Sequence, residues 1–183
     1  MYHVYSRGNR RQEIAFDVAD RRTMLSFTAY AVRRFRWYCH AYCLMPNHYH
    51  FLFETPAPNL SEGMQWLNGR YAQLFNRRHG IDGHLFQGRF GARLLESNWH
   101  LIELSRYIVL NPVRAGLCDS AEDWPWSSYR AAVGLAPRPP FLTLDLILPQ
   151  FGRDQQVAMK NYAEYVAEGV REPDEAGRAS AGV

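Results

Sequence analysis

Apolar and polar residues follow a period of two in several short stretches of the chain, which is the pattern of β-strands. Residues 2–7 alternate, residues 37–44 and the run from Cys43 to Thr55 are rich in aromatic side chains, and residues 92–96 follow a glycine-bracketed loop. The Pro46-Asn47 pair between the second and third stretches is a turn signal. We therefore expect these two strands to pair as a hairpin.

Three longer stretches have helical spacing instead. They are residues 17–35, residues from about 61 to 79 with Ser61 as a possible cap, and residues 98–110, which we expect Pro112 to end. The order strand, helix, strand, strand, helix, strand is the split βαβ pattern. We therefore predict an α+β fold, a ferredoxin-like βαββαβ sandwich whose antiparallel sheet can cover one face with helices and leave the other for a ligand.

The C-terminal part of the chain follows a different pattern. Residues 143–169 predict one or two appended helices, and the composition of residues 171–183 suggests disorder. We expect a main domain over residues 1–135, a helical extension over residues 136–170 and a tail over residues 171–183.

Two histidines stand two positions apart at the head of the third strand. Side chains two apart on a strand share one face, so His48 and His50 project together, while Tyr49, Phe51 and Phe53 project toward a core. Two imidazoles on a stiff strand form half of a divalent-metal site. The alternative is that the pair only fills a half-buried face, so the metal interpretation needs further ligands.

The last predicted helix of the main domain offers such partners. Tyr107 and Asn111, four residues apart, lie on one face of it. The Asn111 amide oxygen suits Mg²⁺ or Mn²⁺ beside two imidazoles, and the Tyr107 phenol can attack phosphorus and form a covalent intermediate. A metal would make that attack feasible, because an unperturbed phenol, with a pKa of about 10, is a poor nucleophile. Taken alone, Tyr107 is more typical of a core aromatic residue, and Asn111 before Pro112 is more typical of a helix terminator.

Composition narrows the class of protein. The chain has 21 basic and 18 acidic residues, a formal net charge of +3, and Lys160 as its only lysine. Arginine suits phosphates and guanine edges, although a coding bias toward arginine explains the same excess. The three cysteines, Cys39, Cys43 and Cys118, give no disulfide framework, and no signal peptide or transmembrane run is recognisable. We expect a soluble, cytoplasmic protein without membrane contact.

Five motifs resemble, in family order, those of the REP-associated tyrosine transposases, which are relatives of the IS200/IS605 transposases within the HUH single-strand nucleases. The motifs are S-R-G-N-R-R-Q (6–12), C-L-M-P-N-H-Y-H (43–50), G-H-L-F-Q-G-R-F (83–90), R-Y-I-V-L-N-P-V-R-A-G-L (106–117) and W-P-W-S-S-Y (124–129). The resemblance covers about residues 2–135 and leaves residues 143–183 without a counterpart.

The resemblance implies a divalent metal, Mg²⁺ or Mn²⁺, on His48 and His50 assisted by Asn111, with Tyr107 as the nucleophile. The implied reaction cleaves single-stranded DNA beside a REP-like hairpin and leaves a 5′-phosphotyrosine and a free 3′-hydroxyl; rejoining is the reverse transesterification. Two alternatives stay open: a hairpin-DNA-binding regulator that no longer cuts, and a metal-dependent nuclease in which water attacks. We expect a monomer or homodimer associated with the nucleoid.

Basic, aromatic and amide side chains around the proposed site are the candidates for contact with DNA. Arginines concentrate between residues 66 and 116, and the loop 83–90 mixes groups that stack on or hydrogen-bond exposed bases. The candidates are Arg7, Arg10, Arg11, Arg70, Arg77, Arg78, His84, Phe86, Gln87, Arg89, Arg93, Arg106 and Arg114. For Arg77 and Arg78, a solvated helix face is an equally good explanation.

Overall fold

The computed structural model describes residues 1–95 and 98–170. In these ranges the strands are β1 (Tyr2–Arg7), β2 (Tyr38–Leu44), β3 (His48–Glu54) and β4 (Gly91–Leu94), and the α-helices are α1 (Val18–Phe35), α2 (Leu60–His79), α3 (Asn98–Arg114), α4 (Tyr129–Ala132) and α5 (Gln155–Glu168). Short 3-10 turns are η1 (Asn9–Arg11), η2 (Ala121–Asp123) and η3 (Leu148–Gln150). None of the helices in the described ranges is long and apolar enough to cross a membrane.

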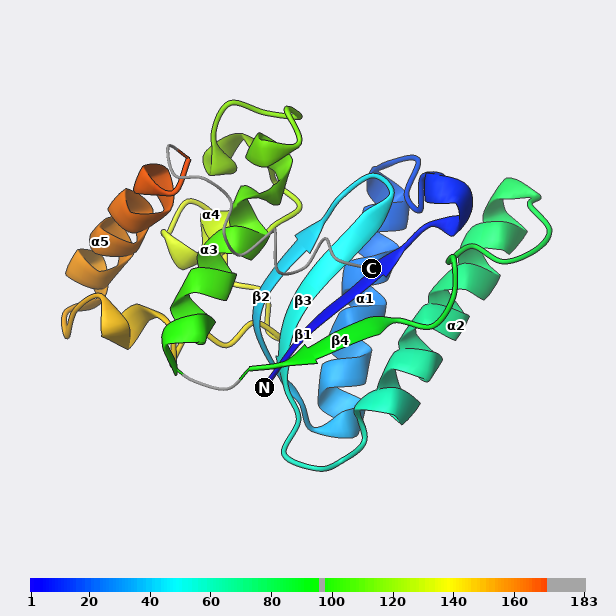
Figure 1. Cartoon of the computed structure of the whole chain (residues 1–183), viewed down its shortest axis with the longest axis horizontal. Helices are drawn as coiled ribbons and strands as arrows, with labels where there is room; N and C mark the ends of the chain where they lie inside the picture. Colours follow the sequence, from blue (N-terminus) through cyan, green and yellow to red (C-terminus); the bar gives the residue numbers. More distant parts are fainter. Residues whose placement is uncertain (96–97, 171–183) are drawn as a thin grey trace.

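The four strands form one antiparallel sheet in the order β2-β3-β1-β4. β3 pairs with both β1 and β2, and β4 pairs with the free edge of β1. β2 and β3 form the hairpin that the turn signal predicted. Helices α1 and α2 lie on one side of the sheet, and α3, α4 and α5 lie on the other (Figure 1). This arrangement confirms the predicted ferredoxin-like α+β class.

Alternate residues of β3 form the centre of the hydrophobic core. Tyr49, Phe51 and Phe53 are fully buried. The Tyr49 hydroxyl donates a hydrogen bond of 2.6 Å to Oδ1 of Asn68 on α2, which shows that this face of the strand meets the α1–α2 layer. The other face of β3 is therefore the one that carries the two histidines.

The start of α2 differs from the expectation. The helix begins at Leu60, with Asn59 before it, so Ser61 lies inside the first turn and is not the cap. The Asn59 side chain instead accepts a hydrogen bond of 2.7 Å from the indole nitrogen of Trp37. This bond ties the helix start to the beginning of β2.

Helix α3 continues past Pro112 to Arg114, so the expectation that the proline ends this helix was wrong. A proline lacks the N–H that would bond the carbonyl four residues back, but it can remain in a helix whose other bonds persist. One such helical bond follows the proline: the Ala115 N–H donates a hydrogen bond of 3.0 Å to the Asn111 carbonyl. Asn111 therefore lies within the helix, one turn after Tyr107.

The C-terminal segment packs against the outer strand β2. The Thr143 N–H donates to the Cys39 carbonyl at 2.7 Å, and Leu142 pairs with Cys39 in an isolated parallel bridge. Helix α5 adds Tyr162 and Val166, each 1% exposed, to the hydrophobic core. The predicted C-terminal helices are thus α5 and the turn η3, and the tail over residues 171–183 lies outside the described residues.

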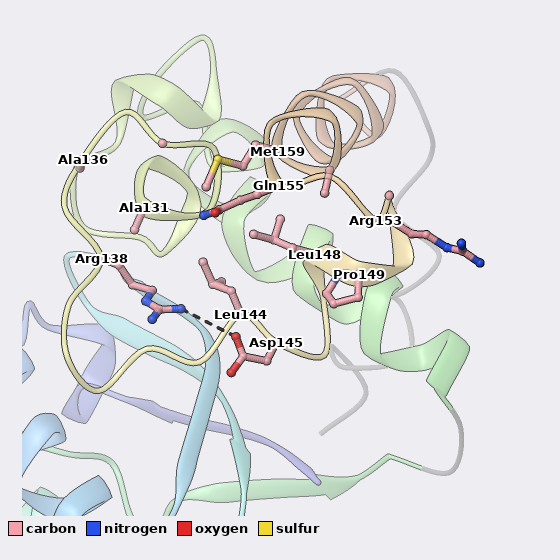
Figure 2. A pocket seen from close by; sticks show the side chains of 13 residues that line it. Ala131, Ala136, Arg138, Leu144, Asp145, Leu148, Pro149, Arg153, Gln155 and Met159 are labelled. Atoms are coloured by element: carbon pink, nitrogen blue, oxygen red, sulfur yellow. Dashed lines mark ion pairs between the residues drawn. The ribbon is translucent and has the colours of Figure 1, made fainter.

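Residues between positions 131 and 159 line an open hollow of about 770 Å³ (Figure 2). Leu144, Leu148 and Met159 contribute apolar surface, and Arg138 and Asp145 form an ion pair of 3.8 Å at its side. None of the side chains lining it in the described part of the chain is a predicted site residue. The chemistry implied by the sequence therefore lies elsewhere.

Candidate active site

Three histidines of β1 and β3 cluster on the sheet face opposite α1 and α2. β3 supplies His48 and His50, whose ring centroids are 5.0 Å apart, as the alternation of the strand predicted. The neighbouring strand β1 supplies His3, and its register places Tyr5 opposite His50 and Arg7 opposite His48. His3 and His50 are only 3% and 7% exposed, so these groups are set into the protein.

Asn47 fixes the orientation of His48. Its Oδ1 accepts a hydrogen bond of 2.7 Å from His48 Nδ1, while its Nδ2 donates to the Arg11 carbonyl at 3.2 Å. An amide oxygen only accepts, so His48 Nδ1 carries the proton and Nε2 keeps its lone pair. This is the tautomer that a metal ligand needs.

His50 is oriented by the third histidine. His3 Nε2 lies 2.9 Å from His50 Nδ1, and the two rings stack with centroids 5.1 Å apart. When His50 donates this bond, its own Nε2 keeps the lone pair, as in His48. Both histidines of β3 can then offer Nε2 to a metal.

Burial favours the neutral form of all three imidazoles. Burial, with a smaller contribution from the charge of Arg93, lowers the pKa of His3 from 6.5 to about 4. Burial and the charge of Arg7 lower the pKa of His48 from 6.5 to about 4 as well. The pKa of His50 is held well below its usual value by burial first and then by its basic neighbours. Neutral imidazole is the form that binds metal ions.

Helix α3 packs against β2 and β3 and brings Tyr107 to the histidines. The Tyr107 ring centroid is 5.7 Å from that of His50 and 5.9 Å from that of His3, both edge to face. The guanidinium carbon of Arg114 lies 5.5 Å from the centre of the same ring. A phenol and two imidazoles from distant parts of the sequence therefore meet at one place.

Asn111 is the remaining candidate ligand. Its Nδ2 donates a hydrogen bond of 2.8 Å to the Tyr107 carbonyl, so Oδ1 is the atom of this side chain that could bind a cation. In residues 1–95 and 98–170, no cluster of three or more His, Cys, Asp or Glu side chains could hold a metal. A metal on His48 and His50 would thus need an amide or water oxygen as its third ligand. Imidazole nitrogens bind divalent transition metals and an amide oxygen suits Mg²⁺ or Mn²⁺, so this mixed set of donors is compatible with a divalent cation.

A cleft of about 450 Å³ opens beside His48. Two of the predicted DNA contacts, Arg7 and Arg11, line it together with Glu13, the β2–β3 turn, Ala115 and Leu117. Both arginines are exposed, so their guanidinium groups are accessible to phosphates beside the histidine pair.

Other predicted DNA contacts are exposed but lie on other elements. They are Arg10 in η1, Arg70 and Arg77 on α2, His84, Gln87 and Arg89 in the loop 83–90, Arg93 on β4 and Arg114 at the end of α3. Among these residues, Arg114 lies over the ring of Tyr107.

Phe86 and Arg78 have structural roles that sequence reasoning did not anticipate. Phe86 is 8% exposed and packs edge-on against Tyr49 with ring centroids 5.9 Å apart, so it has no free face on which a base could stack. Arg78 forms ion pairs with Asp17 and with the buried Asp20, which joins α2 to the start of α1. The charge of Arg78 is therefore already matched by carboxylates.

Arg106 is also a structural residue. It is 9% exposed, its Nη2 lies 2.9 Å from Glu103 Oε2, and its guanidinium carbon stands 4.3 Å over the ring of Tyr165. These contacts join α3 to α5, on the side of α3 away from Tyr107. Although it is adjacent to Tyr107 in sequence, Arg106 does not face the histidines.

Two residues of the site, His3 and Asn47, had no role assigned from the sequence. His3 and Asn47 orient the two candidate ligands, and Tyr5 lies beside His50 with ring centroids 6.2 Å apart. The alternation of the first strand did place His3, Tyr5 and Arg7 on one face. The sequence alone does not show that the first strand pairs with the histidine strand. The register of β1 and β3 shows that this face of β1 lies beside His48 and His50.

Fold and site together define a class: a ferredoxin-like protein with a histidine pair on its sheet and a tyrosine on the helix that follows the fourth strand. Residues 1–111 match the family model described as transposase IS200 like. The chain belongs to this family.

Three known proteins are similar to this chain. The chain is 27% identical over 104 residues to a protein of Haemophilus influenzae whose name assigns it provisionally to the REP-associated tyrosine transposases; the match covers 51% of this chain and 59% of the relative, so it spans less than two thirds of that protein. A solved structure of a REP-associated tyrosine transposase bound to a REP hairpin aligns with a TM-score of 0.60 and 20% identity over 79% of this chain and 85% of its own, which supports the fold. A solved structure from Deinococcus radiodurans R1 aligns with a TM-score of 0.43 and 18% identity over 58% of this chain and 86% of its own. The family resemblance seen in the sequence is confirmed.

Proposed function

We propose that this protein is a metal-dependent endonuclease and strand transferase that acts on single-stranded DNA through Tyr107. The observation that carries the proposal is the position of the Tyr107 ring, 5.7 Å from that of His50. Tyr107 Oη would bond to the scissile phosphorus while the P–O3′ bond breaks, and the 3′ oxygen would leave as a hydroxyl with the proton of the phenol. The 5′ end would stay on the tyrosine, and the reverse reaction would rejoin the strand.

His48, His50 and Asn111 are the residues that would hold Mg²⁺ or Mn²⁺. Each histidine would use Nε2, since Nδ1 is engaged with Asn47 or His3. A bound divalent cation polarises a phosphodiester oxygen and makes the phosphorus easier to attack. The hydrogen bond from Asn111 Nδ2 to the Tyr107 carbonyl would hold Oδ1 in place and tie the ligand to the helix turn that carries the nucleophile.

Arginines of the chain would bind and orient the strand. Arg7 and Arg11 line the cleft beside His48, where they could bind the phosphates on one side of the scissile bond. Arg114 packs over the Tyr107 ring and restricts its orientation. Holding the phenol and the phosphate in one geometry is a large part of what such a site can contribute to rate.

We extend the proposal to DNA hairpins of the REP type. The name of the Haemophilus influenzae relative and the hairpin bound in the related structure support this substrate class. The exposed arginines of α2, the loop 83–90 and β4 provide the positive surface that a folded DNA strand would need. DNA transposition or the processing of dispersed hairpin repeats would follow from the same chemistry.

A denaturing gel tests the proposal. Labelled single-stranded hairpin DNA is incubated with Mn²⁺ and the wild-type protein, Tyr107→Phe, His50→Ala, or Tyr30→Phe. Tyr30 is a matched control because it is exposed on α1 and stacks on Trp66, away from the histidines. We expect a slowly migrating DNA–protein adduct with the wild type and Tyr30→Phe, and no adduct with Tyr107→Phe or His50→Ala.

The gel also separates the two alternatives. Cutting without an adduct, undiminished in Tyr107→Phe, would identify water as the attacking group and overturn the tyrosine mechanism. Tight binding of the hairpin with neither cutting nor an adduct would identify a regulator that keeps the fold without the reaction.

A further inference from the structure

A groove of about 790 Å³ lies between helix α2 and the loop 83–90. The helix contributes residues from its exposed side between positions 61 and 76, and the loop contributes all of G-H-L-F-Q-G-R-F. Because α2 covers the sheet face opposite the histidines, the groove is separate from the candidate active site (Figure 1). The proposed function gives a role to Arg89 of this loop motif but none to its uncharged side chains.

Amide side chains dominate the polar lining of the groove. They are Gln65, Asn68, Gln73 and Asn76 from α2 and Gln87 from the loop. The three glutamines are exposed. An amide offers a donor and an acceptor side by side, which matches the edge of a nucleobase better than it matches a phosphate. The only basic side chains lining the groove in the described part of the chain are His84 and Arg89.

The groove also has room for a flat ring. A Cβ atom added at Gly69, Gly83 or Gly88 would meet nothing within 4 Å, so the absence of side chains at these positions leaves the groove open. Phe90, half-buried at the end of the loop, contributes apolar surface on which a ring can stack. The lining thus combines hydrogen-bonding groups with a stacking surface.

Asn76 has unused hydrogen-bonding capacity where the loop meets the helix. Its Nδ2 donates to the Gly83 carbonyl at 2.8 Å. Its Oδ1 is buried and accepts no hydrogen bond from the described residues. An unpaired buried acceptor is unfavourable, and a donor from a molecule in the groove would relieve it.

The loop is joined directly to the strand end beside the histidines. The Gln87 N–H donates to the Arg7 carbonyl at 2.9 Å, and the Asn9 N–H donates to the Leu85 carbonyl at 2.8 Å. Arg7 is also opposite His48 in the sheet and lines the cleft beside it. The loop therefore links the groove to the strand end beside that cleft, and a DNA strand that leaves the cleft past Arg7 would pass close to Gln87.

We propose that this groove binds and reads bases of the single-stranded DNA next to the scissile phosphate, with Gln65, Gln73 and Gln87 as specificity-determining residues. The inference rests on the proposed function, because it assigns a second surface to the strand that Tyr107 would cut. Glutamine pairs bidentately with the N6 and N7 edge of adenine. We therefore expect adenine to be preferred at one or more flanking positions.

Binding to a panel of oligonucleotides tests this. Each carries the same hairpin with a single-stranded flank in which one position at a time is varied among the four bases, and Kd is measured by fluorescence anisotropy at fixed salt. The wild type is compared with the double variant Gln65→Ala/Gln73→Ala and with Gly69→Phe. Gly69→Phe fills the groove without harming the helix, because phenylalanine is a better helix former than glycine.

The matched control is Gln156→Ala, which removes an exposed glutamine from α5, outside the groove. We expect the wild type and Gln156→Ala to discriminate at least about tenfold between bases at one or more flanking positions. We expect both groove variants to lose most of this preference while their affinity for the hairpin without a flank stays unchanged. Thermal melting of each variant shows whether it is folded.

Three results would overturn the inference: no base preference in the wild type, a preference that survives in both groove variants, or an equal loss of affinity for every flank sequence. The last would identify a groove that binds the DNA backbone. The Tyr107 adduct, measured in parallel on the best oligonucleotide, reports on the proposed function independently. An adduct with unchanged base preference in Gly69→Phe would overturn the groove alone, and absence of an adduct in the wild type would overturn the function.

Discussion

His3 and His50 face each other across the two central strands, with 2.9 Å between His3 Nε2 and His50 Nδ1. When His50 donates this bond, its Nε2 keeps the lone pair that a metal needs, and His3 then orients His50 as Asn47 orients His48. Groups that bond the far nitrogen of a ligating histidine fix its tautomer and orientation. His3 is therefore a positioning residue for the candidate metal site.

Replacing His3 by alanine is expected to weaken Mn²⁺ binding by about 10- to 100-fold, because His50 loses the group that orients it. His3→Gln should retain part of the affinity, since its amide oxygen can accept the same hydrogen bond. Titration of the DNA-free protein with Mn²⁺, followed by electron paramagnetic resonance, measures this directly. His84→Ala, on the exposed loop, is the control. Unchanged Mn²⁺ affinity in His3→Ala would mean that His3 only fills space.

The stability of the metal-free protein should depend on pH through the buried histidines. The pKa of both His3 and His48 is lowered from 6.5 to about 4 by burial. Below about 6.5 the unfolded chain takes up protons that the folded protein excludes, so stability is complete above pH 6.5 and falls as the pH drops toward about 4. Each group can contribute up to about 1.4 kcal/mol per pH unit.

Thermal melting in a chelator between pH 7 and pH 4.5 checks this expectation. The variant His3→Asn/His48→Asn should show a flatter decline of Tm than the wild type, because it lacks both groups. Parallel curves for the two proteins would assign the acid sensitivity to other residues.

The two strand faces could be predicted from the sequence because alternation is a local property. Tyr49 and His50 are neighbours in the chain, yet one is in the core and the other in the candidate site, as the period of two requires. The relation between His3 and His50 could not be predicted, because it depends on which strands pair and in what register. His3 and His50 are 47 residues apart in the chain, and they meet only because of the strand order and register of the whole sheet.

The predicted DNA contacts show the same limit. Arg77 and Arg78 are adjacent in the sequence and share the same surroundings along the chain. Of the two, only Arg78 forms ion pairs with Asp17 and Asp20 at the start of α1. Arg106 is next to Tyr107, but turns toward α5 because successive residues on a helix point in different directions. The distribution of charge and the sequence motifs predicted a basic region. Only the structure shows which of its arginines already form ion pairs with carboxylates.

We therefore expect substitution of Arg78 to affect stability and substitution of Arg77 to affect DNA binding. Arg78→Ala should lower Tm by several degrees, because it removes a partner of the buried Asp20 carboxylate, which His79 and the Phe16 N–H only partly satisfy. Arg77→Ala should leave Tm unchanged and weaken binding of single-stranded DNA, more at low salt than at high salt. Melting curves and anisotropy titrations on both variants decide the matter, and loss of DNA affinity in a fully folded Arg78→Ala would return that residue to the DNA-binding surface.

Helix α5 should hold the helix of the nucleophile in place. Tyr165 packs under the Arg106 guanidinium, 4.3 Å from its carbon, and its hydroxyl donates to Glu103, which also pairs with Arg106. Because Arg106 precedes Tyr107, a shift of this cluster shifts the phenol relative to His50. A displacement of about 1 Å can cost on the order of 100-fold in rate.

We therefore expect Tyr165→Ala to lower the rate of adduct formation by about tenfold or more while the Kd for hairpin DNA stays unchanged. Tyr165→Phe keeps the ring under the guanidinium and loses only one hydrogen bond, about 1 kcal/mol, so it should retain most of the rate. Lys160→Ala is the control, because its pair with Glu164 on α5 is exposed and 3.8 Å long. Single-turnover rates and Kd values for the three variants separate positioning from binding. Equal falls in affinity and rate would instead mean that α5 contacts the DNA.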